Sequence, residues 1–180
     1  MSDQSRRPAP PDLTTDAGRI AFNSLLNDRL PTKRNIAQGL LRNERGEVLL
    51  CELTYKKDWD LPGGVVDPRE SPRECVEREI AEELDIDVVA SRLLAVNWLP
   101  PYRGWDDAVL FLFDLGTVDS SKTRRMSLLK REIREVHWVA PADLDAHVAD
   151  YTAAMVRRVV DGASGDGRTV YLEDSAPVDS

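Results

Sequence analysis

The sequence is poor in the residues that build disulfide frameworks and zinc sites. It has two cysteines, Cys51 and Cys75, and two histidines, His137 and His147. A disulfide scaffold or a structural zinc site needs several such residues at short, fixed spacings, and the sequence offers no such set. We therefore interpret the cysteines as small buried apolar residues and the histidines as ordinary surface residues.

Long apolar runs and a surplus of positive charge are also missing. No segment approaches the roughly 20 apolar residues that cross a bilayer, and the polar, proline-rich first residues do not resemble a secretory signal. We therefore expect a cytoplasmic protein without a membrane partner. The net charge is −8, whereas proteins that grip long nucleic acids normally carry a basic surface. A phosphate ligand would need a divalent cation to neutralise it.

The length of the chain predicts one main domain. With 180 residues the chain can bury one core and is too short for two ordinary domains. We expect a disordered lead-in at residues 1–12, a helical extension at 13–33, the main domain at 34–161 and a C-terminal extension at 162–180.

Hydrophobic periodicity and turn residues predict the elements of this domain. The expected strands cover residues 36–41, 48–53, 88–98, 108–115 and 134–139. The expected helices cover residues 14–30, 71–84 and 141–160. Because strands and helices are mixed and most connections are short, we predict an α/β fold with one mixed sheet flanked by helices.

The helix at residues 71–84 begins with a complete start signal. Ser71 can cap it, Pro72 suits its first turn, and Glu74 closes a capping box. Offsets of three and four residues place Glu79, Glu82 and Glu83 together along one stripe.

Such a cluster of carboxylates is costly. Two carboxylates about 4 Å apart repel by roughly 4 kcal/mol at an effective dielectric constant of about 20. A solvated acidic face is the usual explanation for a helix rich in glutamate. The residues that flank this helix favour a different explanation for the glutamates.

The flanking residues have a specific spacing. Five residues separate Gly64 from Glu70, and seven more lead to Arg78, which is followed by the glutamates, Asp85 and Ile86. This pattern resembles the Nudix box, with Asp85 in place of the usual glycine. Six fixed matches at one offset have a chance probability of about 10⁻⁷ when each residue type fills roughly 7% of positions.

The resemblance implies a Nudix-type α/β/α sandwich over about residues 34–160. It also implies hydrolysis of a pyrophosphate bond in a nucleoside diphosphate linked to another moiety, of the (d)NTP or of the ADP-ribose and nucleotide-sugar type. The expected partner is therefore a small nucleotide substrate, and whether the chain forms a homodimer is left open.

The resemblance further implies a metal site. Glu79, Glu82 and Glu83 resemble the family's ligands of Mg²⁺ or Mn²⁺, hard cations that prefer oxygen donors. The carbonyl of Gly63 is a further expected ligand. Glycines at 63 and 64 would let the backbone approach the metal, although a plain turn would also explain them.

Other roles follow from the same resemblance. Glu70 is expected to pair with Arg78 and orient the loop before the helix. Glu79 is the first choice for the general base that activates water, and Glu132 and Glu135 are alternative candidates.

The substrate side is less defined in the sequence. Tyr102, Arg103 and Trp105, in the loop at residues 100–107, could stack on a base or contact a phosphate, and Glu132 and Glu135 are further candidates for substrate contacts. Two alternatives remain: a catalytically silent Nudix-fold module that binds a nucleotide, and an acidic helix in an unrelated scaffold. The complete set of box glutamates favours an enzyme.

Overall fold

The computed structural model describes residues 10–162 and 168–177 and consists of two units, Met1–Thr32 and Lys33–Ser180. In the first unit, helix α1 (Asp16–Asn27) starts at Thr15, whose side-chain oxygen accepts a hydrogen bond from the Gly18 N–H. The predicted helix is therefore confirmed within shorter bounds. None of the residues of α1 is buried.

The second unit is built on one eight-stranded mixed sheet with the order β6-β2-β1-β5-β4-β7-β8, and β3 pairs with β1 off this path. The strands are β1 (Arg34–Asn43), β2 (Val48–Leu53), β3 (Gly63–Val65), β4 (Arg92–Leu99), β5 (Ala108–Val118), β6 (Ile133–Val139), β7 (Val170–Glu173) and β8 (Ala176–Pro177). The pairs β1–β5 and β4–β7 are parallel, and the other pairs are antiparallel.

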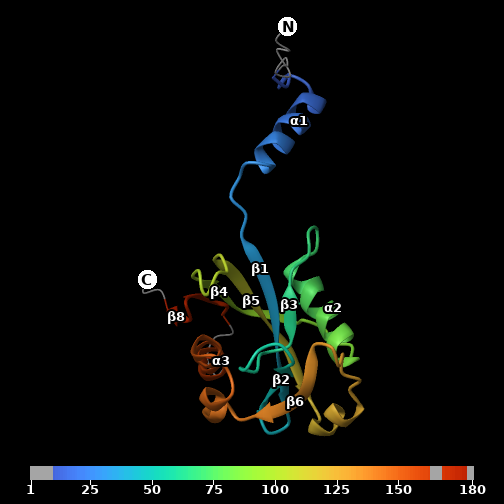
Figure 1. Cartoon of the computed structure of the whole chain (residues 1–180), viewed down its shortest axis with the longest axis vertical. Coiled ribbons are helices and arrows are strands. Elements are labelled where there is room, and N and C mark those ends of the chain that lie inside the picture. The colour runs from blue at the N-terminus through green and yellow to red at the C-terminus, as the bar shows by residue number, and fades with distance from the viewer. Residues whose placement is uncertain (1–9, 163–167, 178–180) are drawn as a thin grey trace. The chain divides into compact units, whose positions relative to one another are not determined.

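Helices α2 (Pro72–Leu84) and α3 (Asp150–Gly162) cover opposite faces of this sheet (Figure 1). Alternate residues of a strand point to opposite faces. Accordingly, Ala37 and Leu41 of β1 join the core cluster under α2, whereas Leu40 joins the cluster under α3. The predicted α/β/α arrangement is therefore confirmed, and both cysteines are free and buried, as expected. None of the helices in the described ranges is long and apolar enough to span a membrane.

Helix α2 forms where its start signal predicts. The Ser71 side chain accepts a hydrogen bond from the Glu74 N–H at 3.2 Å, and the Glu74 carboxylate accepts one from the Ser71 N–H at 2.9 Å. The helix ends at Asp85, which adopts the left-handed conformation with φ 56° and ψ 43°. This conformation is the one that suits a glycine at the end of a helix.

Replacing Asp85 by glycine should therefore be tolerated. Glycine adopts a left-handed conformation without the steric cost that aspartate incurs. We expect Asp85→Gly to keep full activity and to change the free energy of unfolding by less than about 1 kcal/mol, in the stabilising direction. Urea denaturation and a hydrolysis assay check this, and a folded but inactive variant would contradict the alignment of the box.

The prediction of one continuous helix over residues 141–160 is wrong. The structure has a 3-10 helix, η2 (Pro141–Ala146), and then α3. The break occurs at His147, whose carbonyl accepts a hydrogen bond from the Trp59 N–H at 2.8 Å. Because that carbonyl is bonded to another segment, it does not accept the intrahelical bond that would continue the helix.

Two further differences concern the strands. The predicted strand at 88–98 begins only at Arg92, because the preceding residues pack along α2, where the Ala90 N–H donates to Glu77 at 2.8 Å. The C-terminal strands β7 and β8 were not predicted. Strand β7 joins the edge of the sheet beside β4 and buries Leu172.

Candidate active site

Two glycines bring β3 close to its neighbours. Gly63 pairs with Gln38 and Gly64 pairs with Ala37 of β1. Gly63 has φ +137°, and a Cβ on it would lie 2.2 Å from the Ala37 carbonyl oxygen. A Cβ on Gly64 would lie 2.4 Å from Oε1 of Glu79. The absence of side chains at 63 and 64 therefore lets β3 fit between β1 and the acidic stripe of α2.

Arg78 connects the acidic residues of this region. Its Nε and Nη2 donate to the two carboxylate oxygens of Glu70 at 2.7 and 3.1 Å. Its Nη1 donates to Glu79 at 3.0 Å and to Glu82 at 3.3 Å. The hydrogen bonds from Arg78 lower the pKa of Glu70 to about 2. The structure therefore brings four of the sequence-predicted residues into one network.

Glu83 is the most buried carboxylate of the group, with 6% of its surface exposed. Burial, followed by the charges of Glu79, Glu132 and Asp60, raises its pKa to about 8, although a backbone hydrogen bond from Gly63 acts in the opposite direction. Burial also raises the pKa of Glu79. Several carboxylates thus converge at a partly buried place, where their ionisation is disfavoured mainly by burial and further by their neighbouring charges.

The two alternative candidates for the general base lie in different places. Glu132, just before β6, is close enough for its charge to raise the pKa of both Glu79 and Glu83. Glu135 pairs with Glu52 across β2 and β6. Because Cys51 and Leu53 of β2 point to the α2 side, Glu52 and its partner Glu135 lie on the α3 side.

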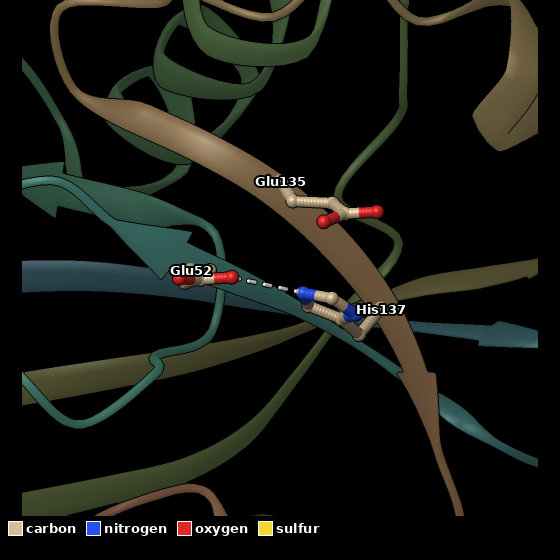
Figure 2. Close-up of side chains that lie close together, drawn as sticks. All are labelled: Glu52, Glu135 and His137. Atoms are coloured by element: carbon tan, nitrogen blue, oxygen red, sulfur yellow. Dashed lines mark hydrogen bonds and ion pairs between the residues drawn. The ribbon is translucent and has the colours of Figure 1, made fainter.

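Glu135 belongs to a second polar cluster, with Glu52 and His137 (Figure 2). One potential ligand atom from each of the three lies within 4.8 Å of the others. Glu52 already receives a hydrogen bond from Arg134 at 2.7 Å and lies 3.3 Å from Nε2 of His137. Arg134 therefore already neutralises Glu52, and we assign no ion to the cluster.

The interpretation of the histidines as ordinary surface residues needs correction. Both rings are half-buried and stack on opposite sides of Trp59. The centroid of Trp59 lies 3.9 Å from that of His137 and 4.2 Å from that of His147. They fix the loop that leads from β2 to Gly63.

The candidate substrate residues of the β4–β5 loop lie close to one another. Tyr102 and Trp105 exchange two backbone hydrogen bonds of 3.0 and 2.9 Å. The guanidinium of Arg103 lies 5.0 Å from the ring centroid of Tyr102. Both aromatic rings are largely exposed. The loop follows β4 and leads into β5, which is paired with the start of β1.

Asp60 is a polar residue of this region that the sequence analysis missed. Its carboxylate accepts hydrogen bonds from Gln38 at 2.9 Å and from Lys56 at 2.6 Å, and its charge contributes to the raised pKa values of Glu83 and Tyr151. Its position three residues before Gly63 was the available signal. Nothing in the sequence revealed Gln38 or Tyr151, because they meet Asp60 only through the fold.

Comparisons with known proteins agree with this geometry. The NUDIX domain family matches residues 32–159. A putative 8-oxo-dGTP diphosphatase of Bacillus subtilis is 28% identical over 73% of this chain and 83% of that protein. An RNA pyrophosphohydrolase of Pseudomonas paraeruginosa is 35% identical over 37% of this chain and 38% of that protein. Among solved structures, the MutT protein of Methanosarcina mazei has a TM-score of 0.63 and 27% identity, covering 76% of this chain and 100% of that one.

The family match spans most of the chain, and it includes β1 to β6, the glycines of β3 and the acidic stripe of α2. The chain therefore belongs to the NUDIX family, and it is a Nudix hydrolase.

Proposed function

We propose that this Nudix hydrolase cuts the pyrophosphate bond of a small nucleotide, and that it does so with Mg²⁺ or Mn²⁺. The observation that carries the proposal is the convergence of Glu79, Glu82 and Glu83 beside Gly63. The curated relatives that match the chain carry the names of 8-oxo-dGTP diphosphatase and RNA pyrophosphohydrolase, which supports a nucleoside triphosphate or another nucleoside diphosphate derivative as the substrate.

The residues fit a hard divalent cation. Carboxylates and a backbone carbonyl are the oxygen donors that Mg²⁺ and Mn²⁺ prefer. Burial raises the pKa values of Glu79 and Glu83, and the charges of neighbouring acids add to this effect, so a bound cation would favour the ionised form of both groups. Glu79, Glu82, Glu83 and the Gly63 carbonyl would hold the ion. When bound, it would polarise the phosphoryl oxygens, lower the pKa of water and neutralise the leaving group.

The chain's own residues would orient the reaction. Arg78 fixes the carboxylates of Glu79 and Glu82, and Glu70 fixes Arg78 through two hydrogen bonds. We assign Glu79 as the general base that accepts the proton of the attacking water. Tyr102, Arg103 and Trp105 are the proposed contacts to the rest of the substrate.

A panel of substrates tests the proposal. Nucleotide products would be resolved by chromatography with Mg²⁺, with Mn²⁺ and in EDTA over nucleoside triphosphates, ADP-ribose, nucleotide sugars and dinucleoside polyphosphates, because cleavage of ADP-ribose or of a nucleotide sugar yields two phosphate esters and no free phosphate. We expect turnover of at least one substrate class only with metal, and a loss of about 100-fold or more in Glu79→Gln and Glu82→Gln. If no substrate turns over, or if both variants match wild type, the proposal fails.

Glu132 and Glu135 provide a matched pair of variants. Glu132 acts electrostatically on Glu79 and Glu83, whereas Glu135 lies on the other face of the sheet. Because charge near the reacting water matters most, we expect Glu132→Gln to lower kcat about 10-fold or more, and Glu135→Gln to leave it within about twofold. Steady-state kinetics of both variants on the best substrate of the panel tests this expectation. If Glu135→Gln lowers kcat more than Glu132→Gln does, the carboxylate that assists catalysis lies on the α3 side of the sheet.

A further inference from the structure

Arg34 has no ion-pair partner within the described ranges, although the chain has 32 acidic residues. Its guanidinium lies 4.3 Å from the ring centroid of Trp105. Its Nε is buried without a hydrogen-bond acceptor. Asp107, the acidic residue at the end of this loop, is already used, because it pairs with Lys33 and accepts a hydrogen bond from Trp98 at 3.0 Å. The contact with Trp105 thus fixes the guanidinium of Arg34, and no carboxylate of the described residues forms an ion pair with it.

Arg34 lies on the α3 side of β1, as does Gln38, whose side chain donates a hydrogen bond to Asp60 at 2.9 Å. Arg34, Ile36 and Gln38 alternate onto one face, and Ile36 packs against the core cluster that includes α3. Gln38 pairs with Gly63. Gln38 lies four residues along the strand from Arg34, which corresponds to about 13 Å.

Tyr151 lies within electrostatic reach of groups at both ends of this face. It lies at the start of α3, and its pKa responds to the charge of Arg34 as well as to the charges of Asp60 and Lys56. Asp60 in turn contacts Gln38. Gln38 and Asp60 are thus in contact on this face, and the charge of Arg34 reaches Tyr151 without a direct contact between the two.

The Arg34–Trp105 pair has the chemistry of an anion site. A guanidinium presents planar, paired N–H donors that match the oxygens of a phosphoryl group. Stacking on the indole restricts the side chain before any ligand arrives, which lowers the entropic cost of binding. Trp105 itself is 64% exposed, so the pair is open to solvent.

We propose that Arg34, positioned by Trp105, binds a phosphoryl group on the part of the substrate remote from the scissile pyrophosphate. The inference rests on the proposed hydrolase function and narrows its substrate class. The favoured substrates are nucleoside diphosphate derivatives that carry an additional phosphate on the nucleoside.

Matched substrates test this inference. ADP-ribose would be compared with 2′-phospho-ADP-ribose, and dephospho-coenzyme A with coenzyme A. In wild type we expect kcat/KM to be about 10-fold or more higher for the phosphorylated member of at least one pair. Arg34→Gln should remove this preference through KM while kcat and the activity on the unphosphorylated member stay unchanged. Trp105→Ala should weaken the preference, and Trp105→Phe should keep most of it.

Arg45→Gln is the matched control, because it removes the same charge in the turn between β1 and β2, at the other end of β1. It should leave the preference intact. A wild-type enzyme that hydrolyses both members of each pair equally would overturn the inference and leave the hydrolase proposal standing. Inorganic phosphate could also inhibit the hydrolysis of both members of a pair equally while wild type shows no preference for the phosphorylated member. Arg34 would then bind free phosphate only, and the inference would again be overturned.

A binding measurement separates the two proposals if hydrolysis is not detected. Titration calorimetry would compare AMP with adenosine 2′,5′-bisphosphate and adenosine 3′,5′-bisphosphate on wild type and Arg34→Gln. Binding of one bisphosphate about 10-fold tighter than AMP, lost in the variant, supports the anion site even if the hydrolase proposal fails. Equal binding of all three ligands overturns the anion site.

Discussion

Replacing Glu83 by glutamine should abolish hydrolysis and should also stabilise the metal-free protein at pH 8. Glu83 is a proposed metal ligand, so the variant loses an oxygen donor with a full charge, and we expect kcat/KM to fall about 100-fold or more. The same carboxyl group is buried among other acids, and its pKa is raised to about 8. Its ionisation in the folded, metal-free protein is therefore unfavourable.

The pH dependence of stability follows from the direction of this shift. Between the ordinary value of 4.5 and about 8, the unfolded chain releases the Glu83 proton and the folded chain retains it. Stability therefore falls as pH rises through this window, by up to about 4 kcal/mol from this group. In Glu83→Gln this contribution disappears. Urea denaturation in EDTA at pH 5 and pH 8 should show a smaller difference for the variant than for wild type.

Glu82→Gln serves as the control for Glu83→Gln. The Glu82 side chain is 57% exposed, so its replacement relieves little burial, and we expect the metal-free stability to change by less than about 1 kcal/mol. Its activity should still fall, because Glu82 is also a proposed ligand. If Glu83→Gln is fully active, Glu83 is not a metal ligand. If the stability of the variant depends on pH as strongly as that of wild type, burial of Glu83 does not raise its pKa as the structure indicates.

Local signals explain why the acidic helix could be predicted from the sequence. Ser71, Pro72 and Glu74 specify the start of α2 within four consecutive residues, and the helical repeat then fixes the side on which the glutamates lie. The left-handed end at Asp85 follows from the same local rules. These features depend on residues that are near each other in the chain, and the structure has all of them.

Features that depend on distant residues could not be predicted from local signals. The break at His147 requires the Trp59 N–H, and strand β7 is defined by its parallel pairing with β4. The placement of Glu135 on the α3 side depends on its register with Glu52, since a change of one residue in register would move the side chain to the other face. Turn and helix signals do not specify such pairings.

Gly63 and Gly64 should respond very differently to replacement by alanine. At Gly63 the new Cβ would lie 2.2 Å from the Ala37 carbonyl oxygen and 2.8 Å from the Gln38 Cα, and the backbone has φ +137°. Both atoms belong to the paired strand β1, so β3 would have to move. We expect Gly63→Ala to lower the free energy of unfolding by about 3 kcal/mol or more.

At Gly64 the three atoms nearest to the new Cβ all belong to the Glu79 side chain, with Oε1 2.4 Å away. A side chain can rotate where a strand cannot, so Gly64→Ala should keep the fold but displace the carboxylate that we assign as general base. Since a displacement of about 1 Å can cost about 100-fold in rate, we expect a 10- to 100-fold loss of kcat, roughly, with stability changed by less than about 1.5 kcal/mol.

Gly46→Ala separates the effect of the backbone conformation from the effect of these contacts. Gly46 also has a positive φ, +76°, but a Cβ there would meet nothing within 4 Å. This variant should therefore be destabilised by about 1 kcal/mol and should keep its activity. Thermal unfolding and kinetics on all three variants give the comparison. If Gly64→Ala retains wild-type kcat, then the position of Glu79 is not set by its contact with β3, and its role as the base loses its structural support.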